Sequence, residues 1–395
     1  MLPRVVIMGP ARDAVSGVSE HLNQLMGSGL TKQLDLIHFQ VGSEGRQESR
    51  AARVLRLIAS PLQLAHLLIR AHASAIHLNT SIDRRAFWRD LLYVFVAKAL
   101  RCKIVYQIHG GILPEQVRQR SPMLSQMFSA FLLLCNAIVV LTTEEERQYR
   151  ALVRGVPVVR IPNAIDLAPY SDFPERDYQS ETPLRLVFIG RLAASKGIYD
   201  ALEAMDLITQ HDAACRIFLA IAGNGPEKER LEKRIAERRL EDRVRLLGPV
   251  FDEGKTLFWR NADLFIFPTR REGLPYAVLE SLAAGTPVVT TRVGGIPDAV
   301  DDGVHGVLLD AISPSAVATA ITDLLAHPET LRRMSRACRQ RAAERYGIVR
   351  LERQFSELYQ TLFPNGSSHA QGAFPYLDSP QHGTGCSVRK KRKAD

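Results

Sequence analysis

The chain has 395 residues, of which 46% are hydrophobic and 24% are charged, and its formal net charge is +9 at pH 7. This composition is typical of a globular protein of about two domains and excludes a single small core. The five cysteines are odd in number and widely scattered, with no Cys-x-x-Cys pair, so the sequence indicates neither a disulfide framework nor a zinc cluster.

The positive charge is spread unevenly along the chain. Residues 1–174 hold 20 Lys and Arg against 13 Asp and Glu, and residues 389–393 read RKKRK. Two interpretations stay open: the basic half meets an anionic membrane surface, or its charges are only solvated surface. A nucleic-acid partner is not expected, because the sequence shows neither interleaved aromatic and basic residues nor a recognition-helix pattern.

The sequence predicts neither a membrane span nor an export signal. No window reaches the roughly 18 uncharged apolar residues that a span needs, and the start MLPRVVIMGP enters a strand-like run without a signal-peptide pattern. We therefore expect a cytoplasmic location, with any membrane contact made peripherally on the inner face.

The first half of the chain alternates short runs rich in β-branched residues with helix-length segments. The runs are RVVIMG (4–9), LDLIHF (34–39), AIHLN (75–79), KIVYQIHG (103–110), AIVVLT (137–142) and VVRIPN (158–163). This alternation predicts βαβ units and a parallel sheet in a first domain at 1–165. The polar stretch 166–183 then interrupts the pattern, and we interpret it as a linker.

The same pattern restarts in the second half. The runs are RLVFIGR (185–191), RIFLAIAGNG (216–225), RVRLLG (243–248), DLFIFPT (263–269), PVVTT (287–291) and HGVLLD (305–310). They predict a second domain at 184–345, so the fold class is α/β with two doubly wound Rossmann-like domains. Ligands of such sheets bind beyond the carboxyl ends of the strands, which places the chemistry in the loops after these runs.

Two further segments follow the second domain. Residues 346–363 are expected to form a C-terminal helix that returns to the first domain. Residues 364–395 are rich in Gly, Ser and Pro and contain the basic run, a composition typical of a flexible tail.

The stretch REGLPYAVLE (271–280) is predicted to join a strand to a helix. Pro275 suits the first turn of that helix, and Gly285 suits its C-terminal cap. The amide N–H groups around residues 273–277 then lack helical partners, and together with the helix dipole they make an anion site. Glu272 lies in the loop that faces this site.

Glu280 falls inside the predicted helix among apolar neighbours. A carboxylate there is costly unless it accepts hydrogen bonds, and a vicinal diol such as ribose offers two donors. The alternative is structural: Glu272 caps the helix, and Glu280 pairs with a local Arg or reaches solvent.

Two cations follow the first strand of the second domain. GRLAASKG (190–197) places Arg191 and Lys196 in a glycine-flanked loop, where they are able to hold a diphosphate without a metal. The alternative is ordinary surface charge. No Asp-x-Asp occurs in the chain, so the usual carboxylate pair that chelates a metal diphosphate is missing. We therefore expect no metal and no cofactor.

Taken together, these segments resemble a known family. GRLAASKG, AGNGP, the stretch from ADLFIFPT to GGIPDAV and HGVLLD are similar, in order and spacing, to the C-terminal domain of retaining glycosyltransferase family 4 (glycosyltransferase group 1). Glu272 and Glu280 correspond to the Glu-x7-Glu pair of that family. The resemblance covers residues 184–312 and implies the GT-B fold, in which two Rossmann-like domains face each other across a cleft.

The resemblance also implies site residues. The implied catalytic residues are Glu272, His109, Arg191 and Lys196. The implied donor-binding residues are Gly17, Arg191, Lys196, Gly223, Asn224, Gly273, Leu274, Tyr276 and Glu280. In this assignment the two cations bind the diphosphate, Glu280 holds the ribose hydroxyls, and Glu272 with the neighbouring amides holds the donor sugar and phosphate.

The first domain matches the family more loosely. SGVSEHL (16–22) resembles the family's glycine loop. Ser16 replaces the usual first glycine, and Gly17 stands at the position of the second. His109, at the end of the strand QIHGG, matches a histidine that contacts the transferred sugar; the alternative is a structural histidine. Residues 109–134 pair a basic segment with an apolar one, which indicates either a bilayer-docking segment or a buried core helix.

The function implied is transfer of a sugar from a nucleotide diphosphate donor to a hydroxyl of a glycan or lipid-linked acceptor, with retention. A UDP-sugar is the first expected donor and GDP-mannose the second, in cell-surface polysaccharide or glycolipid assembly. A non-catalytic nucleotide-sugar-binding protein and an epimerase or phosphorylase on the same fold remain alternatives. A dinucleotide-dependent oxidoreductase is disfavoured, because Gly9 and Gly17 are too far apart for Gly-x-Gly-x-x-Gly.

Overall fold

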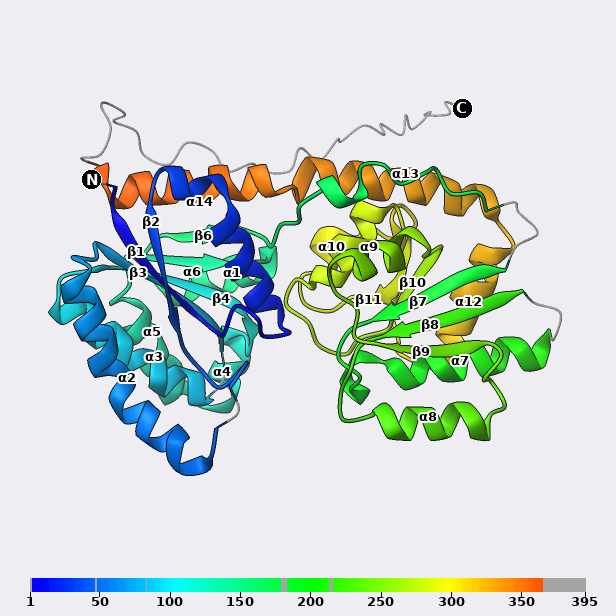
Figure 1. Cartoon of the computed structure of the whole chain (residues 1–395), viewed down its shortest axis with the longest axis horizontal. Coiled ribbons are helices and arrows are strands. Elements are labelled where there is room, and N and C mark those ends of the chain that lie inside the picture. The colour runs from blue at the N-terminus through cyan, green and yellow to red at the C-terminus, as the bar shows by residue number, and fades with distance from the viewer. Residues whose placement is uncertain (1, 47, 83, 179–182, 213–215, 365–395) are drawn as a thin grey trace, which may run out of the picture.

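The chain folds into two α/β domains that lie side by side (Figure 1). The computed structural model describes residues 2–46, 48–82, 84–178, 183–212 and 216–364. Each domain is built on a six-stranded parallel sheet, so the predicted fold class is confirmed. The tail predicted at 364–395 lies, after Pro364, outside the described residues.

The strands coincide with the predicted runs to within a few residues. In spatial order, the first sheet contains β2 (Asp35–Gln40), β1 (Arg4–Gly9), β3 (Ala75–Ile82), β4 (Lys103–Gly111), β5 (Ala137–Val140) and β6 (Val158–Arg160). The second contains β12 (Gly306–Leu309), β11 (Val288–Thr291), β10 (Leu264–Phe267), β7 (Leu184–Ile189), β8 (Ile217–Ala222) and β9 (Val244–Gly248). Most of these strands are buried on both faces, which is why their sequences are nearly continuous apolar runs.

The helices of the N-terminal domain cover both faces of its sheet. They are α1 (Gly17–Gly27), η1 (Gly29–Lys32), α2 (Arg50–Arg70), α3 (Arg84–Ala99), α4 (Pro114–Arg120), α5 (Pro122–Leu132) and α6 (Thr143–Leu152). Side chains of α2, α3, α5 and α6 share one core with one face of the sheet, and those of α1 pack on the opposite face.

The C-terminal domain has helices above and below its sheet in the view of Figure 1. They are η2 (Ala168–Tyr170), η3 (Ala194–Lys196), α7 (Ile198–His211), α8 (Lys228–Glu237), α9 (Asp252–Arg260), α10 (Tyr276–Ala284), α11 (Ile296–Ala299), α12 (Pro314–Leu325) and α13 (Pro328–Arg345), followed by α14 (Ile348–Leu362). The helix predicted after the loop at 270–274 is α10. Pro275, predicted in its first turn, is its N-cap, one position earlier, and Gly285, in the left-handed region, is its C-cap as predicted.

Helix α14 follows the C-terminal domain in sequence but packs on the N-terminal domain, where Figure 1 shows it beside α1. Leu351, Phe355 and Leu358 are buried on the sheet face that α1 also covers. The hydroxyl of Tyr359 lies 2.7 Å from Nδ1 of His77 on β3. Burial of each such apolar side chain stabilises the contact by about 1.5–3 kcal/mol, so the chain end fastens the two domains together.

The chain therefore passes between the domains twice, and the two passages touch. The amide of Ile165 donates to the carbonyl of Tyr346 at 2.7 Å, and the amide of Ile348 donates to the carbonyl of Ile165 at 3.1 Å. These bonds place the junction at residues 163–167 and 346–348.

The stretch interpreted as a linker joins the domains, but its described part, 166–178, packs closely on the C-terminal domain. Tyr170, Phe173 and Tyr178 are buried in the core of that domain. The sequence did not indicate this packing, because these three aromatic residues are separated by polar and charged residues and form no apolar run.

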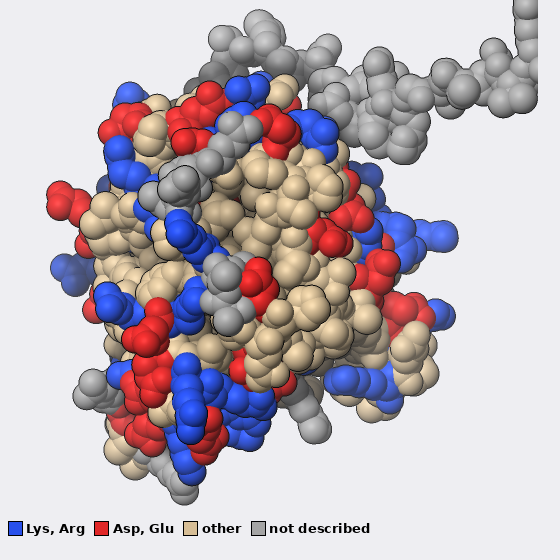
Figure 2. Space-filling model, turned by 90° about the vertical axis from the view of Figure 1, so that its right-hand side faces the viewer, with Lys and Arg blue, Asp and Glu red and all other residues tan. Residues whose placement is uncertain are grey.

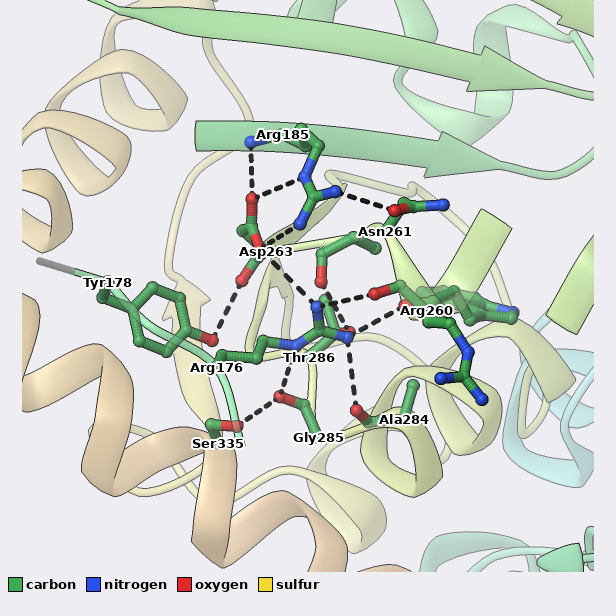
Figure 3. Close-up of polar contacts among 12 residues, drawn as sticks. Arg176, Tyr178, Arg185, Arg260, Asn261, Asp263, Ala284, Gly285, Thr286 and Ser335 are labelled. Carbon is green, nitrogen blue, oxygen red and sulfur yellow. Dashed lines mark hydrogen bonds and ion pairs between the residues drawn. The ribbon is translucent and has the colours of Figure 1, made fainter. Parts of the chain in front are cut away.

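Arg176, in the same stretch, binds the carboxyl ends of two helices (Figure 3). Its guanidinium donates to the carbonyls of Trp259 at 2.9 Å and Arg260 at 3.2 Å, in the last turn of α9. It also donates to those of Ala284 at 3.3 Å and Gly285 at 3.4 Å, at the end of α10. A cation at the negative end of a helix dipole is stabilising, and here one cation serves two helices.

Candidate active site

The loops after β7 and β10 bring Lys196 and Glu272 together. Lys196 Nζ lies 2.5 Å from Glu272 Oε1 and 5.9 Å from the ring centre of Phe267. The hydroxyl of Thr269 donates to the same carboxylate oxygen at 3.1 Å. The Glu272 side chain is only 9% exposed, so the ion pair is largely shielded from solvent.

Arg191, in the loop that follows β7, differs from Lys196 in having no bound partner. Its side chain is exposed, and no hydrogen bond or ion pair joins it to another side chain in the part of the chain that the structure describes. Because β7 is hydrogen-bonded to β10, this free cation stands at the same sheet edge as the loop of Glu272.

The amino end of α10 presents free amides beside this pair. Among the described residues, no acceptor bonds to the N–H groups of Gly273, Leu274, Tyr276 and Ala277. Pro275, between them, has no N–H. Such a helix end binds anions, because unpaired donors and the positive end of the helix dipole coincide.

The carbonyls of the same loop are occupied by the protein. The amide of Gly295 donates to the carbonyl of Gly273 at 2.6 Å, and Asn163 Nδ2 donates to the carbonyl of Leu274 at 2.7 Å. Asn163 belongs to the interdomain junction, so the anion loop is held partly by a residue from outside its own domain. Sequence reasoning missed this contact.

Glu280 is buried and bound to two donors on α9. Its side-chain oxygens accept from Lys255 Nζ at 2.8 Å and from Trp259 Nε1 at 3.0 Å. Burial alone lowers the pKa of Lys255, but the Glu280 carboxylate more than offsets this effect, so that pKa is raised. The structural alternative for Glu280 is therefore correct in part: it pairs with a cation, although that cation is a lysine and not an arginine.

Pairing leaves Glu280 with further acceptor capacity. Each carboxylate oxygen offers two lone-pair positions. In the described contacts each oxygen accepts from only one donor, so one position on each oxygen stays unused. Glu280 is therefore able to accept from a diol as well. Sequence reasoning missed Lys255 and Trp259, since nothing in their own helix marks them as partners of a residue on α10.

Gly223 and Asn224 form the loop after β8, against the loop of Arg191. The amide of Leu192 donates to the carbonyl of Asn224 at 2.9 Å. Gly223 has a φ of +138°, and a Cβ there would lie 1.9 Å from the carbonyl oxygen of Gly190. Only glycine fits this close approach, so the two loops form one edge of the site.

His109 lies near the C-terminal end of β4 in the N-terminal domain and is partly buried. Asn79 Nδ2 donates to the carbonyl of Met8, which turns Asn79 Oδ1 toward His109 Nε2 at 2.8 Å. Nε2 therefore carries the proton. Burial, with His21 and His77 close by, holds the pKa of His109 well below its ordinary value. The ring is neutral, and its Nδ1 has no partner among the described residues.

The two domains meet at these loops. A Cβ added to Gly110 would lie 3.2 Å from the Cα of Gly273, so the segment after His109 touches the segment after Glu272. At Gly17, the first residue of α1, a Cβ would lie 3.6 Å from the ring of Tyr276. The predicted residues of both domains therefore converge at one boundary, although no hydrogen bond joins the His109 side chain to the C-terminal domain within the described part of the chain.

Tyr276 places an unpaired hydroxyl at this boundary. The oxygen is buried and has no hydrogen-bond partner among the described residues. Burial, together with the carboxylates of Glu20 and Glu280, holds the pKa of Tyr276 well above its ordinary value, so the hydroxyl keeps its proton as a donor. The sequence pointed to the amide of Tyr276 and not to its hydroxyl.

The described residues contain no group of three or more His, Cys, Asp or Glu that is placed to hold a metal ion. Lys196 is bound to Glu272, the residue before the anion loop, and the exposed Arg191 follows β7, the strand next to β10. This set favours a ligand that carries negative charge of its own.

Solved structures share both domains of this arrangement. Sucrose-phosphate synthase from Thermosynechococcus elongatus is similar with a TM-score of 0.74 at 19% identity, over 92% of this chain and 99% of that chain. The Anabaena protein HepE in complex with UDP-glucose gives a TM-score of 0.71 at 17% identity, over 91% and 99% of the two chains. The two parallel six-stranded sheets with their flanking helices are the GT-B fold of glycosyltransferases.

A family model matches the second domain of the chain. Residues 172–341, which include Glu272 and Glu280, match the family model described as glycosyl transferases group 1. The C-terminal domain of the chain is therefore similar to the group 1 glycosyltransferases, over the region where the sequence motifs indicated that resemblance. The narrower assignment to family 4 stays a prediction.

Curated relatives match over the same part of the chain. Alpha-D-kanosaminyltransferase from Streptomyces kanamyceticus is 29% identical over 177 residues, which are 45% of this chain and 45% of that protein. D-inositol 3-phosphate glycosyltransferase from Corynebacterium urealyticum is 33% identical over 180 residues, 44% of this chain and 42% of that protein. The chain thus matches less than half the length of these relatives.

Proposed function

We propose that this protein transfers a sugar from a nucleoside diphosphate donor to a hydroxyl of a glycan or lipid-linked acceptor. The observation that carries the proposal is the amino end of α10, where four amides have no acceptor among the described residues. Lys196 is bound to the adjacent Glu272, and the exposed Arg191 follows β7, the strand next to β10. Helix amino ends and side-chain cations are the groups that stabilise phosphate oxygens. A donor diphosphate fits this set without a metal ion.

The remaining residues provide places for the two ends of the donor. Glu280 accepts from the ribose hydroxyls, and Gly223 and Asn224 border the base. The hydroxyl of Tyr276 and the neutral Nδ1 of His109 offer one donor and one acceptor at the domain boundary. We propose UDP-sugars as the first donors to test and GDP-mannose as the second, supported by the UDP and UDP-glucose bound to HepE, which has the same fold.

The proposed chemistry is substitution with retention at the anomeric carbon. The bond from the anomeric carbon to the phosphate oxygen breaks, and the acceptor oxygen forms its bond on the same face. The acceptor's proton passes to the departing phosphate. Glu272 is not proposed as a nucleophile, because its carboxylate is already held by Lys196 and Thr269.

Stabilisation of the departing diphosphate supplies most of the rate in this proposal. Arg191, Lys196 and the amides of α10 are fixed before the reaction, so they need little reorganisation as charge develops on the phosphate. Loss of one such preorganised donor typically lowers kcat by about 10²–10³-fold. We place the reaction in polysaccharide or glycolipid assembly, as the resemblance implied.

The first experiment is a thermal-shift screen of nucleotide sugars in the presence of EDTA. A true donor at about 100 times its dissociation constant adds roughly 2.7 kcal/mol to the free energy of unfolding. We expect stabilisation by at least one UDP-sugar or by GDP-mannose, and release of the nucleoside diphosphate on incubation with an acceptor glycan.

Variants then test the site. Arg191→Ala and Glu272→Ala are expected to lose nucleotide release by about 100-fold or more while staying folded. Arg245→Ala, which removes an exposed arginine from the edge strand β9, is the matched control and keeps full activity. Full activity in both site variants, or no stabilisation by any nucleotide sugar, contradicts the proposal.

A further inference from the structure

Helix α2 has apolar side chains on two opposite faces. Ser60, Leu64 and Leu68 recur every four residues on the buried face. The outward apolar residues are Val54 (58% exposed), Leu55 (68%), Ile58 (68%), Leu62 (73%) and Ile69 (60%). Successive residues of a helix are about 100° apart, so Leu55, Ile58, Leu62 and Ile69 lie on the side away from the buried residues, and Val54 lies at the flank.

Helix α3 repeats the arrangement. Trp88, Leu92 and Phe95 follow one another at helical spacing and are 49%, 50% and 54% exposed. Its opposite side buries Tyr93 in the core that also contains Leu64 and Leu68 of α2. The hydroxyl of Tyr93 lies 2.9 Å from that of Ser60, so the two helices touch.

The outward apolar residues of both helices therefore lie on the same side of the N-terminal domain. We call this set the α2–α3 face: Val54, Leu55, Ile58, Leu62, Ile69, Trp88, Leu92 and Phe95. Single exposed apolar residues are ordinary, but a contiguous set marks an interaction surface.

Helix α8 of the C-terminal domain has a single apolar face, unlike α2 and α3. Its apolar Leu231 and Ile235 are buried, and charged residues fill the outer side. Figure 2 shows side chains of both charges gathered at the bottom of that end of the molecule, where α8 lies. Ion pairs such as Arg234 with Glu203 tie α8 to α7.

Positive charge accompanies the α2–α3 face. Residues 46–134 hold 13 Lys and Arg against 4 Asp and Glu, whereas residues 1–45 and 135–174 together hold 7 against 9. The whole positive excess of the first 174 residues thus falls in the segment that contains α2 and α3. Arg46, Arg70, Lys98 and Arg101 are exposed, and in the described part of the chain no ion pair neutralises them.

We propose that the α2–α3 face docks on the surface of an anionic lipid bilayer. The apolar side chains enter the boundary between headgroups and acyl chains, and the unpaired cations contact the headgroups. Trp88 suits that boundary, since its ring is apolar and its N–H is polar. This proposal does not depend on the proposed function, although a lipid-linked acceptor would be presented at the same surface.

Surface docking fits α2 better than spanning does. By length and composition, Ala51–Arg70 is the one described helix that is able to cross a membrane. Leu64 and Leu68, however, hold one face of this helix in the domain core. In the segment 109–134, where the sequence left bilayer docking open, Phe128 and Phe131 are buried, so the core alternative is correct for those residues.

Vesicle co-sedimentation of the full chain tests the proposal. We expect binding to vesicles of equal parts phosphatidylglycerol and phosphatidylcholine, and weak binding to phosphatidylcholine alone. The double variant Ile58→Glu and Leu62→Glu should lower binding at least about tenfold. Arg70→Gln with Lys98→Gln should lower binding to the anionic vesicles by a similar factor. The affinity of this variant should then be close to that of the unchanged chain at high salt, where charges are screened.

Two controls make the test specific. Leu257→Glu with Val349→Glu changes two exposed apolar residues outside this face, 58% and 74% exposed, and should bind as the unchanged chain does. Every comparison is repeated with residues 389–393 changed to Gln, so that the basic run does not decide the result. The proposal is overturned if the control Leu257→Glu with Val349→Glu loses as much binding as Ile58→Glu with Leu62→Glu, or if binding needs only residues 389–393.

Trp88 provides an independent reading of the contact. The chain has two tryptophans, and Trp259 is fully buried. Anionic vesicles should therefore shift the emission of Trp88 to the blue, brominated lipid should quench it, and Trp88→Phe should remove both responses. No change in emission on binding contradicts the assignment. So does a lipid-free dimer that Ile58→Glu with Leu62→Glu dissociates, since the face would then join two copies of the chain.

Discussion

At the end of β4, the imidazole of His109 lies beside two others, those of His21 and His77. Burial lowers the pKa of His21 to about 3 and that of His77 to about 4, and it holds the pKa of His109 well below its ordinary value. The unfolded chain would protonate these rings near pH 6.5. Because the unfolded state then binds more protons, their contribution to stability is complete above that pH and is lost as the pH falls toward 4 and 3.

His109 therefore acts, in our account, as a neutral hydrogen-bond acceptor. We expect His109→Ala to lower kcat/KM by about 10–100-fold, the effect of one lost hydrogen bond in the transition state. The pH profile between about pH 5.5 and 8 should keep its shape, because a ring without a proton has no ionisation to lose there. Steady-state kinetics across this range measure both quantities. A limb with an apparent pKa near 6.5 that vanishes in the variant would show that His109 titrates.

Some residues of the site can be predicted from their neighbours in sequence, and others cannot. Lys196 and Glu272 stand beside glycine, proline and strand ends, and Glu280 is a carboxylate among apolar residues of a helix, so their own neighbours indicate their role. Lys255 and Trp259 lie on an ordinary amphipathic helix, and only the packing of α9 on α10 makes them partners of Glu280. No pattern within α9 carries that information.

At the scale of elements, Arg176 connects the interdomain stretch to the helices that carry the site. Its side chain is 6% exposed, and the nearest carboxylate, on Asp263, is 3.5 Å away (Figure 3). Burial lowers its pKa, yet carbonyls at the ends of α9 and α10 take up its donors. Those two helices hold Lys255 and Glu280, so one arginine fixes how they sit together.

We expect Arg176→Met to destabilise the protein by about 3–5 kcal/mol, because it removes a buried cation and leaves carbonyls unpaired. Arg185→Met is the control: Arg185 also contacts Asp263, but its side chain is 46% exposed, so the cost should stay near 0–1 kcal/mol. Urea denaturation measures both. Equal costs would mean that Arg176 does not organise the two helices.

The strands were predictable and some helices were not, for a physical reason. A strand buried on both faces is a continuous apolar run, which is visible in one sequence. Helix α2 is apolar on its inner and outer faces, so its periodicity does not say which face is buried. The stretch 166–178 reads as polar because its anchors are few, and its packing follows from contacts across the domain.

For the whole molecule, the two chain passages at 163–167 and 346–348 define where the domains are able to move relative to each other. Residues 168–178 pack on the C-terminal domain, where Arg176 binds the end of α9. Helix α14 packs on the N-terminal domain, where Phe355 is buried. The segments after His109 and Glu272 already touch in this structure, so an opening about this junction would admit the donor and its reversal would exclude water.

In the proposed complex, Arg191, Lys196 and the amides of α10 hold the donor diphosphate. Calorimetric titration of UDP and of uridine, both in EDTA, separates the diphosphate from the nucleoside. We expect UDP to bind, uridine to bind at least about 100-fold more weakly, and Arg191→Ala with Lys196→Ala to cost UDP about two orders of magnitude. Uridine binding in that variant, and UDP binding in Arg245→Ala, should not change. UDP affinity that survives the double change, or that appears only when manganese is added, would contradict the account.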